Sequence, residues 1–354
     1  MTVLVTGGAG FIGSALVRYL VGTGQKVVNI DKLTYAGDLR TLESVANNPS
    51  YEFAQIDICS ADALAAVFKK HQPTRVFHLA AETHVDRSID GPLAFAQTNV
   101  IGTVTLLQAA TTHWERLAPA EQTAFRFLNV STDEVYGELG DTGLFKETTP
   151  YAPNSPYSAS KASADHFARA WHRTYGLPTL ITNCSNNYGP FQNKEKLIPT
   201  VVLSALSGSD IPIYGAGENV RDWLYVDDHV RGLELVAQSG GVGETFNIGG
   251  SNELTNIKLV RKICDLLDRL SPRQDGKKYA EQIRFVTDRP GHDARYAIDA
   301  EKIKAGLKWA PLEDLETGLE KTIAWYLSNL WWLGELKAPE RLGSSLGSNA
   351  GQSV

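Results

Sequence analysis

The stretch TGGAGFIG at residues 6–13 decides the fold of this chain. It follows an apolar, β-rich run at residues 2–5 and opens a segment of helical periodicity. Gly7, Gly10 and Gly13 allow a tight turn and let the backbone approach a pyrophosphate, which then lies at the positive end of the helix. A glycine loop between a strand and a helix therefore predicts a dinucleotide-binding site.

Outward from this loop, the first half of the chain alternates short apolar runs with segments of helical periodicity. The expected strands are Thr2–Thr6, Lys26–Ile30, Tyr51–Ile56, Arg75–Leu79, Phe125–Val130 and Thr179–Thr182. The expected helices are Phe11–Val21, Asp62–His71, Val100–His113 and Ser155–Tyr175. Alternating elements of this kind form a parallel sheet with helices on both faces. The sequence predicts an α/β fold, a Rossmann-type doubly wound parallel sheet.

The alternation breaks after the last of these strands. Residues 186–190 are interpreted as a loop, and short pieces separated by Gly and Pro follow as far as Asp222. The pattern then resumes, with elements expected at Asp227–Gln238, Thr245–Ile248, Asn256–Leu270, Glu301–Leu307 and Leu315–Leu330. We expect a discontinuous nucleotide-binding domain (1–187 plus 223–250) and a smaller C-terminal α/β substrate-binding domain (188–222 plus 251–336). The Gly/Ser-rich tail, 337–354, is expected to be disordered.

Composition narrows the classes of partner. The 354 residues carry a formal net charge of −6 and no long run of Lys and Arg, which argues against nucleic acid as a partner. Cys59, Cys184 and Cys264 form neither a CxxC pair nor a disulfide ladder, and this fits a reducing compartment. No apolar run approaches the ~20 residues of a membrane span, and no signal-peptide pattern precedes the first strand. We expect a cytoplasmic protein with no membrane partner and no metal site.

Acidic and small residues at the ends of the next strands extend the cofactor site. Asp31 ends the second strand, where a carboxylate accepts hydrogen bonds from a ribose 2′-hydroxyl and repels a 2′-phosphate. This favours NAD over NADP, although Lys32 stands beside it. Asp57 and Ile58 follow the third strand and are candidates for contacts with the adenine. Residues 79–81 are small enough for a cofactor to pass closely.

Tyr157 and Lys161 lie four residues apart, on one face of the helix expected after the fifth strand. An ammonium beside a phenol stabilises the phenolate and lowers the tyrosine pKa from about 10. Such a tyrosine can act as a base on a sugar hydroxyl while a hydride leaves for NAD⁺. The alternative is a solvated pair on a helix surface, which the position after a dinucleotide-binding pattern disfavours.

The segment STDEVYG at residues 131–137 lies at the carboxyl end of the fifth strand, where open α/β sheets carry their chemistry. Thr132 can hydrogen-bond a reacting hydroxyl. Asp133 and Glu134 exceed what hydride transfer requires, whereas the elimination of water needs one acid and one base. The alternative is that the two acids merely start a helix, where its dipole favours negative charge.

With these motifs the chain resembles the extended short-chain dehydrogenase/reductases, and within them the nucleoside-diphosphoglucose 4,6-dehydratases. The resemblance covers residues 3–326. Its motifs are TGGAGFIG (6–13), DKLTYAG (31–37), HLAAETHVDRS (78–88), STDEVYG (131–137), YSASK (157–161), NNYGPFQ (186–192), EKLIP (195–199), RDWLYVDDH (221–229) and DRPGHDARYAID (288–299). The adjacent acids are the most specific element, since related epimerases lack them. Thr83 stands where many members carry Ser, and its hydroxyl preserves a substrate hydrogen bond.

The resemblance implies NAD as the cofactor, a nucleoside-diphosphate glucose as the substrate and a three-step cycle. Tyr157 removes the proton of the 4-hydroxyl while a hydride passes from C4 to NAD⁺. Glu134 then removes the C5 proton as Asp133 protonates the departing 6-hydroxyl, and the hydride returns to C6. The product is a 4-keto-6-deoxyglucose nucleotide. The implied catalytic residues are Thr132, Asp133, Glu134, Tyr157 and Lys161.

The resemblance also implies the residues that contact the ligands. The cofactor set is Gly7, Gly10, Phe11, Ile12, Gly13, Asp31, Lys32, Leu33, Thr34, Asp57, Ile58, Leu79, Ala80, Ala81, Thr83, Thr98, Tyr157, Lys161 and Asn187. The substrate set is Thr83, Thr132, Asn186, Lys196, Leu197, Pro212, Ile213, Tyr214, Arg221, Asn256, Asp288, Arg289, Pro290, Gly291 and His292. Arg221 and Arg289 have an independent case, because guanidinium groups suit a diphosphate.

Other functions remain open on the same scaffold. A C4 epimerase or a decarboxylase would also use NAD, Tyr157 and Lys161, and the pair of acids argues against the epimerase. A catalytically silent nucleotide-sensing module is a further alternative, disfavoured because all five catalytic residues are present. By analogy with the family, the helices expected at 100–113 and 155–175 would pair in a homodimer.

Overall fold

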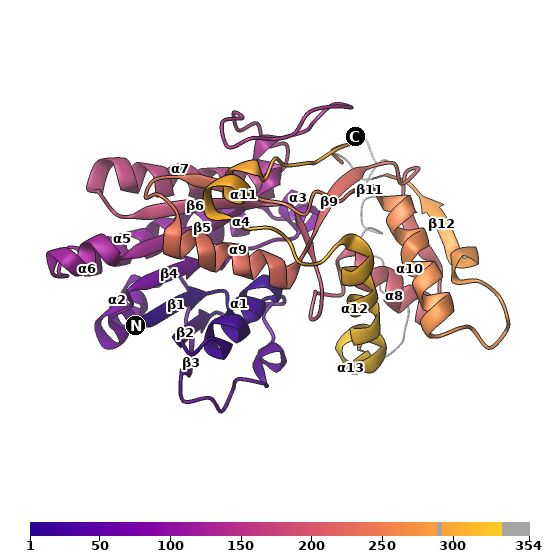
Figure 1. The fold of residues 1–354 in the computed structure, drawn as a ribbon, viewed down its shortest axis with the longest axis horizontal. Helices are drawn as coiled ribbons and strands as arrows, with labels where there is room; N and C mark the ends of the chain where they lie inside the picture. The colour runs from indigo at the N-terminus through magenta and orange to yellow at the C-terminus, as the bar shows by residue number, and fades with distance from the viewer. Residues whose placement is uncertain (289–291, 335–354) are drawn as a thin grey trace, which may run out of the picture.

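The computed structural model describes residues 1–288 and 292–334 (Figure 1). Three of the expected substrate contacts, Arg289, Pro290 and Gly291, lie outside the described residues. So does the tail expected to be disordered, residues 337–354. Among the described residues, no helix is both long enough and apolar enough to cross a membrane.

A seven-stranded sheet forms the larger part of the molecule. Its strands, in the order β10-β6-β5-β4-β1-β2-β3, all pair in parallel. Their bounds are β1 Thr2–Thr6, β2 Lys26–Asp31, β3 Tyr51–Gln55, β4 Arg75–His78, β5 Arg126–Thr132, β6 Thr179–Cys184 and β10 Thr245–Ile248. From β1 the chain winds first toward β3 and then, from β4, the opposite way. The sheet is therefore doubly wound, as predicted, with its switch point between β1 and β4.

Helices cover both faces of this sheet. One face carries α1 (Phe11–Gly22) and α9 (Val226–Ser239), and the other carries α2 (Ala61–His71), α5 (Thr103–Trp114) and α7 (Pro156–Tyr175). Because successive side chains of a strand point to opposite faces, both faces must be apolar.

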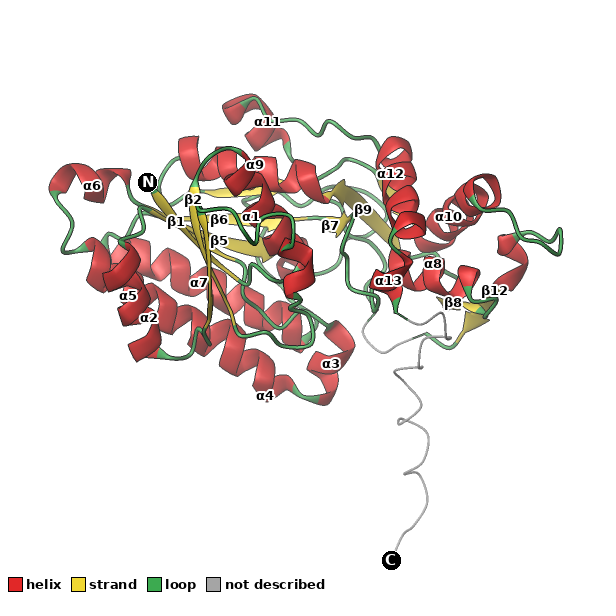
Figure 2. Cartoon of the chain, turned by 90° about the horizontal axis from the view of Figure 1, so that it is seen from below, coloured by secondary structure: helices red, strands yellow, loops and turns green. Residues whose placement is uncertain are grey.

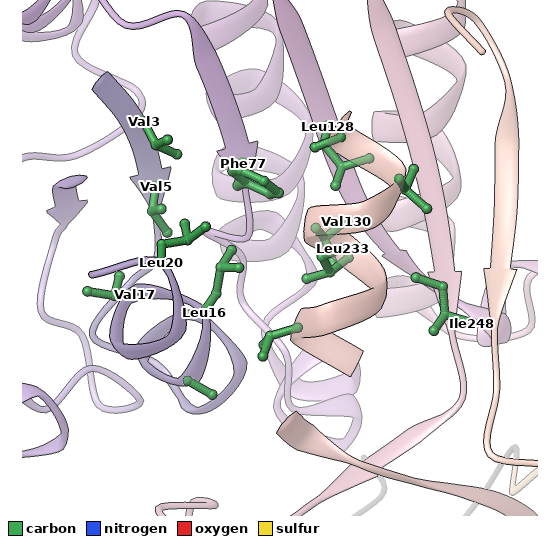
Figure 3. Packing of buried hydrophobic residues seen from close by; sticks show 14 of the residues in the cluster. Val3, Val5, Leu16, Val17, Leu20, Phe77, Leu128, Val130, Leu233 and Ile248 are labelled. Atoms are coloured by element: carbon green, nitrogen blue, oxygen red, sulfur yellow. The ribbon is translucent and has the colours of Figure 1, made fainter. Parts of the chain in front are cut away.

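Strand β1 illustrates this rule. Val3 and Val5 pack with Leu16 and Leu20 of α1 on one face, as Figure 3 shows. Leu4 packs into the separate core on the other face. Apolar residues in succession therefore predict a strand buried on both sides.

Two small sheets and four helices form the second part, which Figure 2 shows beside the main sheet. One sheet has the order β11-β9-β7 and the other pairs β12 with β8. The bounds are β7 Asn186–Tyr188, β8 Ile211–Tyr214, β9 Val220–Tyr225, β11 Glu253–Thr255, β12 Ile283–Val286, α8 Leu197–Leu206, α10 Asn256–Leu270, α12 Leu315–Ser328 and α13 Leu330–Leu333. This part has its own core, in which α8, α10 and α12 pack together.

Several short elements were not predicted. They include the helices α3 Val85–Asp90, α4 Pro92–Phe95 and α6 Pro119–Ala124, the 3-10 helices η1 Leu39–Leu42, η3 Asp133–Tyr136 and η4 Tyr279–Gln282, and, in the second part, α8, α13, β8, β9, β11 and β12. Helix α11 (Glu301–Leu307), which was predicted, packs against α9 and β10 of the larger part.

Two predictions of local structure were wrong. Residues 186–190 do not form a loop throughout, because Asn186–Tyr188 is strand β7 and pairs in parallel with β9. The partner strand lies more than thirty residues away, so local sequence carries no sign of this pairing. The helix expected to begin at Val100 begins earlier, as a π-helix over Ala96–Gly102 that continues into α5. π-helical turns often lie at functional sites.

Candidate active site

A cavity of about 290 Å³ lies at the carboxyl ends of the central strands, beside the switch point of the sheet. The predicted residues that line it are Gly7, Gly10, Phe11, Ile12, Gly13, Asp31, Lys32, Thr34, Asp57, Ile58, Leu79, Ala80, Ala81, Thr83, Thr98, Thr132, Asp133, Glu134, Tyr157, Lys161, Asn186, Asn187 and Lys196. The structure thus brings the expected hydride-transfer and acid–base residues into one cavity.

Nine predicted contacts lie outside this lining: Leu33, Leu197, Pro212, Ile213, Tyr214, Arg221, Asn256, Asp288 and His292. Conversely, the lining includes residues that the sequence did not single out, namely Ile30, Ala36, Gly37, Ile56, Glu82, Val130, Ser131, Cys184, Ser185, Gln192 and Asn193. Most of these residues are neighbours in sequence of a predicted residue. Their position beside a strand end could therefore have predicted that they line the cavity.

The glycine loop is shaped by close backbone contacts. Gly7 adopts φ +72°, and a Cβ there would lie 2.6 Å from the amide nitrogen of Ala80. A Cβ on Gly13 would lie 2.1 Å from the carbonyl oxygen of Gly7. At Gly10, the residue that precedes α1, a Cβ would meet only the Gly7 carbonyl oxygen, at 3.3 Å. Gly10 therefore leaves open space at the N-terminus of α1, where an anion is favoured.

Asp31 links the loop after β1 to the loop after β2. Its carboxylate accepts hydrogen bonds from the amide of Ala9 at 2.9 Å and from the amide of Leu33 at 2.8 Å. Lys32 pairs with Asp57 at 2.6 Å, so its charge is engaged by an acid of the next strand end. Leu33 itself has φ +61° and contributes its backbone to this turn. The geometry holds the Asp31 carboxylate at the cavity wall.

The catalytic candidates are held by the end of β5 and the start of α7. Thr132 ends the strand and caps the 3-10 helix η3, since its hydroxyl oxygen accepts from the amide of Glu134 at 3.3 Å. Ser155 caps α7 through a reciprocal pair of hydrogen bonds with Ser158, and Pro156 occupies the first position of the helix. Both signals fix where these elements begin.

The expected direction of the Tyr157 pKa is not found. Burial of the phenol, together with the charges of Glu134 and other nearby groups, raises the pKa of Tyr157 well above its ordinary value. Lys161 is buried as well, and its ammonium donates to the carbonyl oxygen of Val130 at 2.8 Å. The lowering that we predicted from the four-residue spacing is therefore outweighed by desolvation of the phenol.

Asp133 has the environment of a carboxylic acid that keeps its proton. Only 2% of the residue is exposed, and burial, with the charges of Glu134 and Asp222, raises its pKa well above the ordinary value. The Thr132 hydroxyl donates to its Oδ1 at 3.3 Å, whereas Oδ2 has no hydrogen-bond partner among the described residues. The two acids do start a short helix, as the alternative held, yet a helix-start role does not require so complete a burial.

A chain of hydrogen-bonded, buried polar side chains connects several of the elements around this cavity, and the sequence analysis did not identify it. His78 lies between the hydroxyls of Thr6 and Thr103, each 2.8 Å from one of its ring nitrogens. Asn99, in the π-helix, donates to the Ser160 hydroxyl at 2.8 Å, which in turn bonds the backbone of α7. The available signal was a His and an Asn within otherwise apolar segments.

The predicted substrate contacts fall into two groups. Lys196 reaches the cavity, where its ammonium donates to the carbonyl oxygen of Thr83 at 3.3 Å. Arg221 is not part of the lining, but it is buried and its charge acts on Asp133, and its guanidinium lies 4.3 Å from the ring centre of Tyr296. The Ile213 side chain is buried in the core of the second part, so a ligand could meet only its backbone.

The group outside the lining continues along the second part. The rings of Tyr214 and His292 lie edge to face with centroids 6.3 Å apart, and His292 pairs with Asp288 at 2.7 Å. Asn256 begins α10, and its buried side-chain oxygen has no hydrogen-bond partner in the described part of the chain. None of these residues belongs to the cavity lining.

The chain matches known proteins over nearly its whole length. It belongs to the family described as GDP-mannose 4,6 dehydratase, whose model matches residues 4–322. It is 57% identical to the dTDP-glucose 4,6-dehydratase 1 of Escherichia coli (strain K12), over 96% of both chains.

Two solved structures are similar as well. A dTDP-glucose 4,6-dehydratase of Bacillus anthracis in complex with NAD has a TM-score of 0.84 and 46% identity, covering 95% of this chain and 100% of that one. One of Streptomyces venezuelae with NAD bound has a TM-score of 0.86 and 45% identity, with the same coverage. The family model is named for a GDP-mannose enzyme, whereas these three relatives are named as dTDP-glucose 4,6-dehydratases.

Proposed function

We propose that this protein catalyses the NAD-dependent dehydration of dTDP-glucose to dTDP-4-keto-6-deoxyglucose, a step in the formation of deoxysugars such as rhamnose. The observation that carries the proposal is the buried Asp133 beside Glu134, in the same cavity as Tyr157 and the glycine loop. The identity of more than half of all positions with a named dTDP-glucose 4,6-dehydratase supports the choice of nucleotide over the GDP-mannose description of the family.

The residues of the cavity fit NAD. The open space at Gly10 leaves room for a pyrophosphate at the start of α1, and the Asp31 carboxylate stands where a ribose hydroxyl can donate to it. Asp57 and Ile58 line the side expected to hold the adenine, and Thr98 and Asn187 complete the set. When bound, NAD accepts a hydride from C4 of the glucose and returns it to C6.

Tyr157 is the base for the first step and Thr132 its partner. Thr132 hydrogen-bonds Tyr157, so its hydroxyl can orient the sugar 4-hydroxyl while the Tyr157 oxygen alone takes the proton. Because burial raises the pKa of Tyr157, the phenolate needs a nearby positive charge. We assign this role to Lys161, which lies four residues farther along α7. The result at C4 is a ketone, which makes the proton at C5 acidic.

Glu134 and Asp133 divide the elimination of water between them. Glu134 removes the C5 proton, and Asp133, which burial keeps protonated, donates its proton to the departing 6-hydroxyl. Glu134 then returns a proton to C5. The two carboxyls can differ in role because Asp133 is almost completely buried, whereas Glu134 is partly exposed. Burial favours the protonated acid at Asp133.

The remaining assignments follow from the arrangement of the molecule. We keep the division expected from the sequence, residues 1–187 plus 223–250 for NAD and residues 188–222 plus 251–336 for the sugar nucleotide, with two adjustments: β9 belongs with the second part, and α11 packs on the larger part. We assign Lys196 and Arg221 to the diphosphate of the substrate. The three cysteines are free, which supports a cytoplasmic location. A homodimer through α5 and α7 is proposed by analogy with the family.

The proposal is tested by incubating the purified protein with dTDP-glucose and then adding alkali. A 4-keto-6-deoxy product develops near-ultraviolet absorbance under these conditions, and no reduced nicotinamide should accumulate because C4 oxidation and C6 reduction cancel. Formation of a dTDP-galactose without water loss would instead establish an epimerase. Steady growth of reduced-nicotinamide absorbance would establish a simple dehydrogenase.

A further inference from the structure

Helix α7 carries an inward-facing polar residue at every fourth position. Tyr157 and Lys161 are followed by Asp165 and Arg169, so the stripe runs from the cavity along the helix. Residues four apart lie on the same face of a helix. The first three are buried, and Asp165 is fully enclosed at 0% exposure. The mechanism above uses only the first two, and Asp165 has no role in it.

Asp165 is held by three neutral donors. Its Oδ1 accepts from the amide of Asn129 at 2.7 Å, and its Oδ2 accepts from the hydroxyls of Ser131 at 2.7 Å and Tyr151 at 3.0 Å. Asn129 and Ser131 belong to β5, the strand that ends in the catalytic Thr132. These bonds stabilise a carboxylate without cancelling its charge, so the negative charge remains available to a cation nearby.

The nearby cation on the same face of α7 is Lys161. Its ammonium is buried and bonds a neutral acceptor, the Val130 carbonyl. Burial lowers the pKa of Lys161, and the largest effect opposing it is the charge of Asp165. The other titratable groups that face Lys161 are Cys184 of β6 and His78 of β4.

Neither of these groups is an anion near neutral pH. Burial raises the pKa of Cys184 to about 12, and it lowers that of His78 to about 3. Asp165 is therefore the acid that faces Lys161. Burial raises the pKa of Asp165, and the charge of Lys161 and the hydrogen bonds from Ser131 and Tyr151 oppose that rise and favour the carboxylate. Asp133 and Glu134 act on Tyr157, and Arg169, which donates to Tyr151 at 3.1 Å, faces Asp165 from its other side.

We propose that Asp165 is a positioning residue for the reaction: the buried counter-charge that keeps Lys161 an ammonium, so that Lys161 can support the phenolate of Tyr157. The link to Tyr157 rests on the proposed function, whereas the placement of Asp165 beside Lys161 does not: the two lie four residues apart on α7, and they bond Val130 and its neighbours Asn129 and Ser131 in β5. A buried lysine without a counter-charge loses its proton readily, with pKa decreases of up to about 3–5 units. Without Asp165, the stripe would also hold two cations and no anion.

Asp165→Asn removes the charge and keeps the shape. The amide oxygen can still accept from Asn129, and the amide nitrogen can donate to the hydroxyl oxygens of Ser131 and Tyr151, which also accept. The matched control is Tyr151→Phe, which removes one hydrogen bond to the same carboxylate and leaves its charge. A purely structural role for Asp165 would make the two variants behave alike.

The direct readout is the titration of Lys161, followed by NMR of protein with ¹³C-labelled lysine side chains, the signal being assigned with Lys161→Met. We expect the ammonium of Lys161 to persist above neutral pH in the wild type and in Tyr151→Phe. In Asp165→Asn its pKa should be lower by about 2 units or more. An unchanged titration in Asp165→Asn, or a wild-type Lys161 already neutral at pH 7, would overturn the proposal.

A double variant decides the case in which Asp165→Asn does not fold. If Asp165 is a counter-charge, Lys161→Met/Asp165→Asn folds, because no isolated buried charge is left. Failure of the double variant as well would make Asp165 a structural residue and overturn the proposal. These measurements need no substrate, so their outcome is independent of whether the protein acts on dTDP-glucose.

With an active wild type, the pH profile adds a catalytic readout. The rising limb of kcat/KM in Asp165→Asn should move to higher pH by about 1 unit or more, because a neutral Lys161 no longer favours the phenolate. An unmoved limb, or one displaced to lower pH, would show that Lys161 keeps its charge without Asp165 and would overturn the proposal.

Discussion

Replacing Asp133 by Asn should make the protein more stable and nearly inactive. Asp133 is buried with one oxygen unpartnered among the described residues, and its pKa is raised by burial, by Glu134 and by Asp222. Asparagine has almost the same shape, can still accept from Thr132 and carries no charge to desolvate. It cannot deliver a proton to the departing 6-hydroxyl.

The effect on stability depends on pH in a direction that the pKa shift fixes. In the unfolded chain the carboxyl ionises near its ordinary pKa of about 3.9, whereas in the folded protein it keeps its proton to higher pH. The stability that Asp133 contributes is therefore complete below the unfolded pKa and is lost as pH rises toward the folded pKa. The loss is about 1.4 kcal/mol for each pH unit in that window. Asp133→Asn escapes this loss.

Urea unfolding at pH 7 and at a pH below 4 measures this prediction. Asp133→Asn should unfold at a higher urea concentration than the wild type at pH 7, and the difference should shrink at the acidic pH. Asp222→Asn is the matched control, since burial also raises the pKa of Asp222. Its carboxylate, however, accepts from the amides of Gly250 at 3.1 Å and Asn252 at 2.6 Å, so its replacement should destabilise the fold.

The predicted loss of activity in Asp133→Asn is measured by the turnover of dTDP-glucose. Loss of one general acid typically lowers the rate by about 10²–10⁴-fold. Because C4 oxidation does not need Asp133, a transient absorbance of enzyme-bound reduced nicotinamide should become visible. Near wild-type turnover in Asp133→Asn, or a loss of activity that merely follows a loss of stability, would refute the assignment of Asp133 as the acid.

Three further substitutions test the neighbouring roles. Glu134→Gln should still permit C4 oxidation but should nearly abolish exchange of the C5 hydrogen with deuterated solvent, and ordinary exchange would remove Glu134 as the base. Tyr157→Phe should block the first oxidation, so that neither exchange nor reduced nicotinamide is detected; exchange at the wild-type rate, or any transient reduced nicotinamide, would contradict the role of Tyr157. Asp31→Ala should weaken NAD binding more than NADP binding, measured by calorimetry, and should also lower stability, because the amides of Ala9 and Leu33 lose their acceptor. An equal loss of affinity for both cofactors would exclude Asp31 from the ribose site.

The sequence by itself predicted the main sheet and most of the residues that line the central cavity. Apolar runs buried on both faces predict parallel strands, and seven of them form the sheet within one or two residues of the expected ends. In a doubly wound sheet the carboxyl ends of the central strands lie together, so residues placed after separate strands meet in one cavity. That is why the glycine loop, Asp31, the acids at 133 and 134, and Tyr157 could be assigned to one site before any distance was known.

Only the tertiary structure decided what depends on contacts between distant segments. Strand β7 exists because β9 pairs with it, and the polar chain through Asn99 exists because a π-helix faces α7. The tertiary structure also decided the charge states. A four-residue spacing puts Lys161 near Tyr157, but the pKa of Tyr157 is set by how much water the whole fold removes from the phenol. The same desolvation makes Asp133 an acid and gives the buried Asp165 its importance, and sequence spacing carries no measure of it.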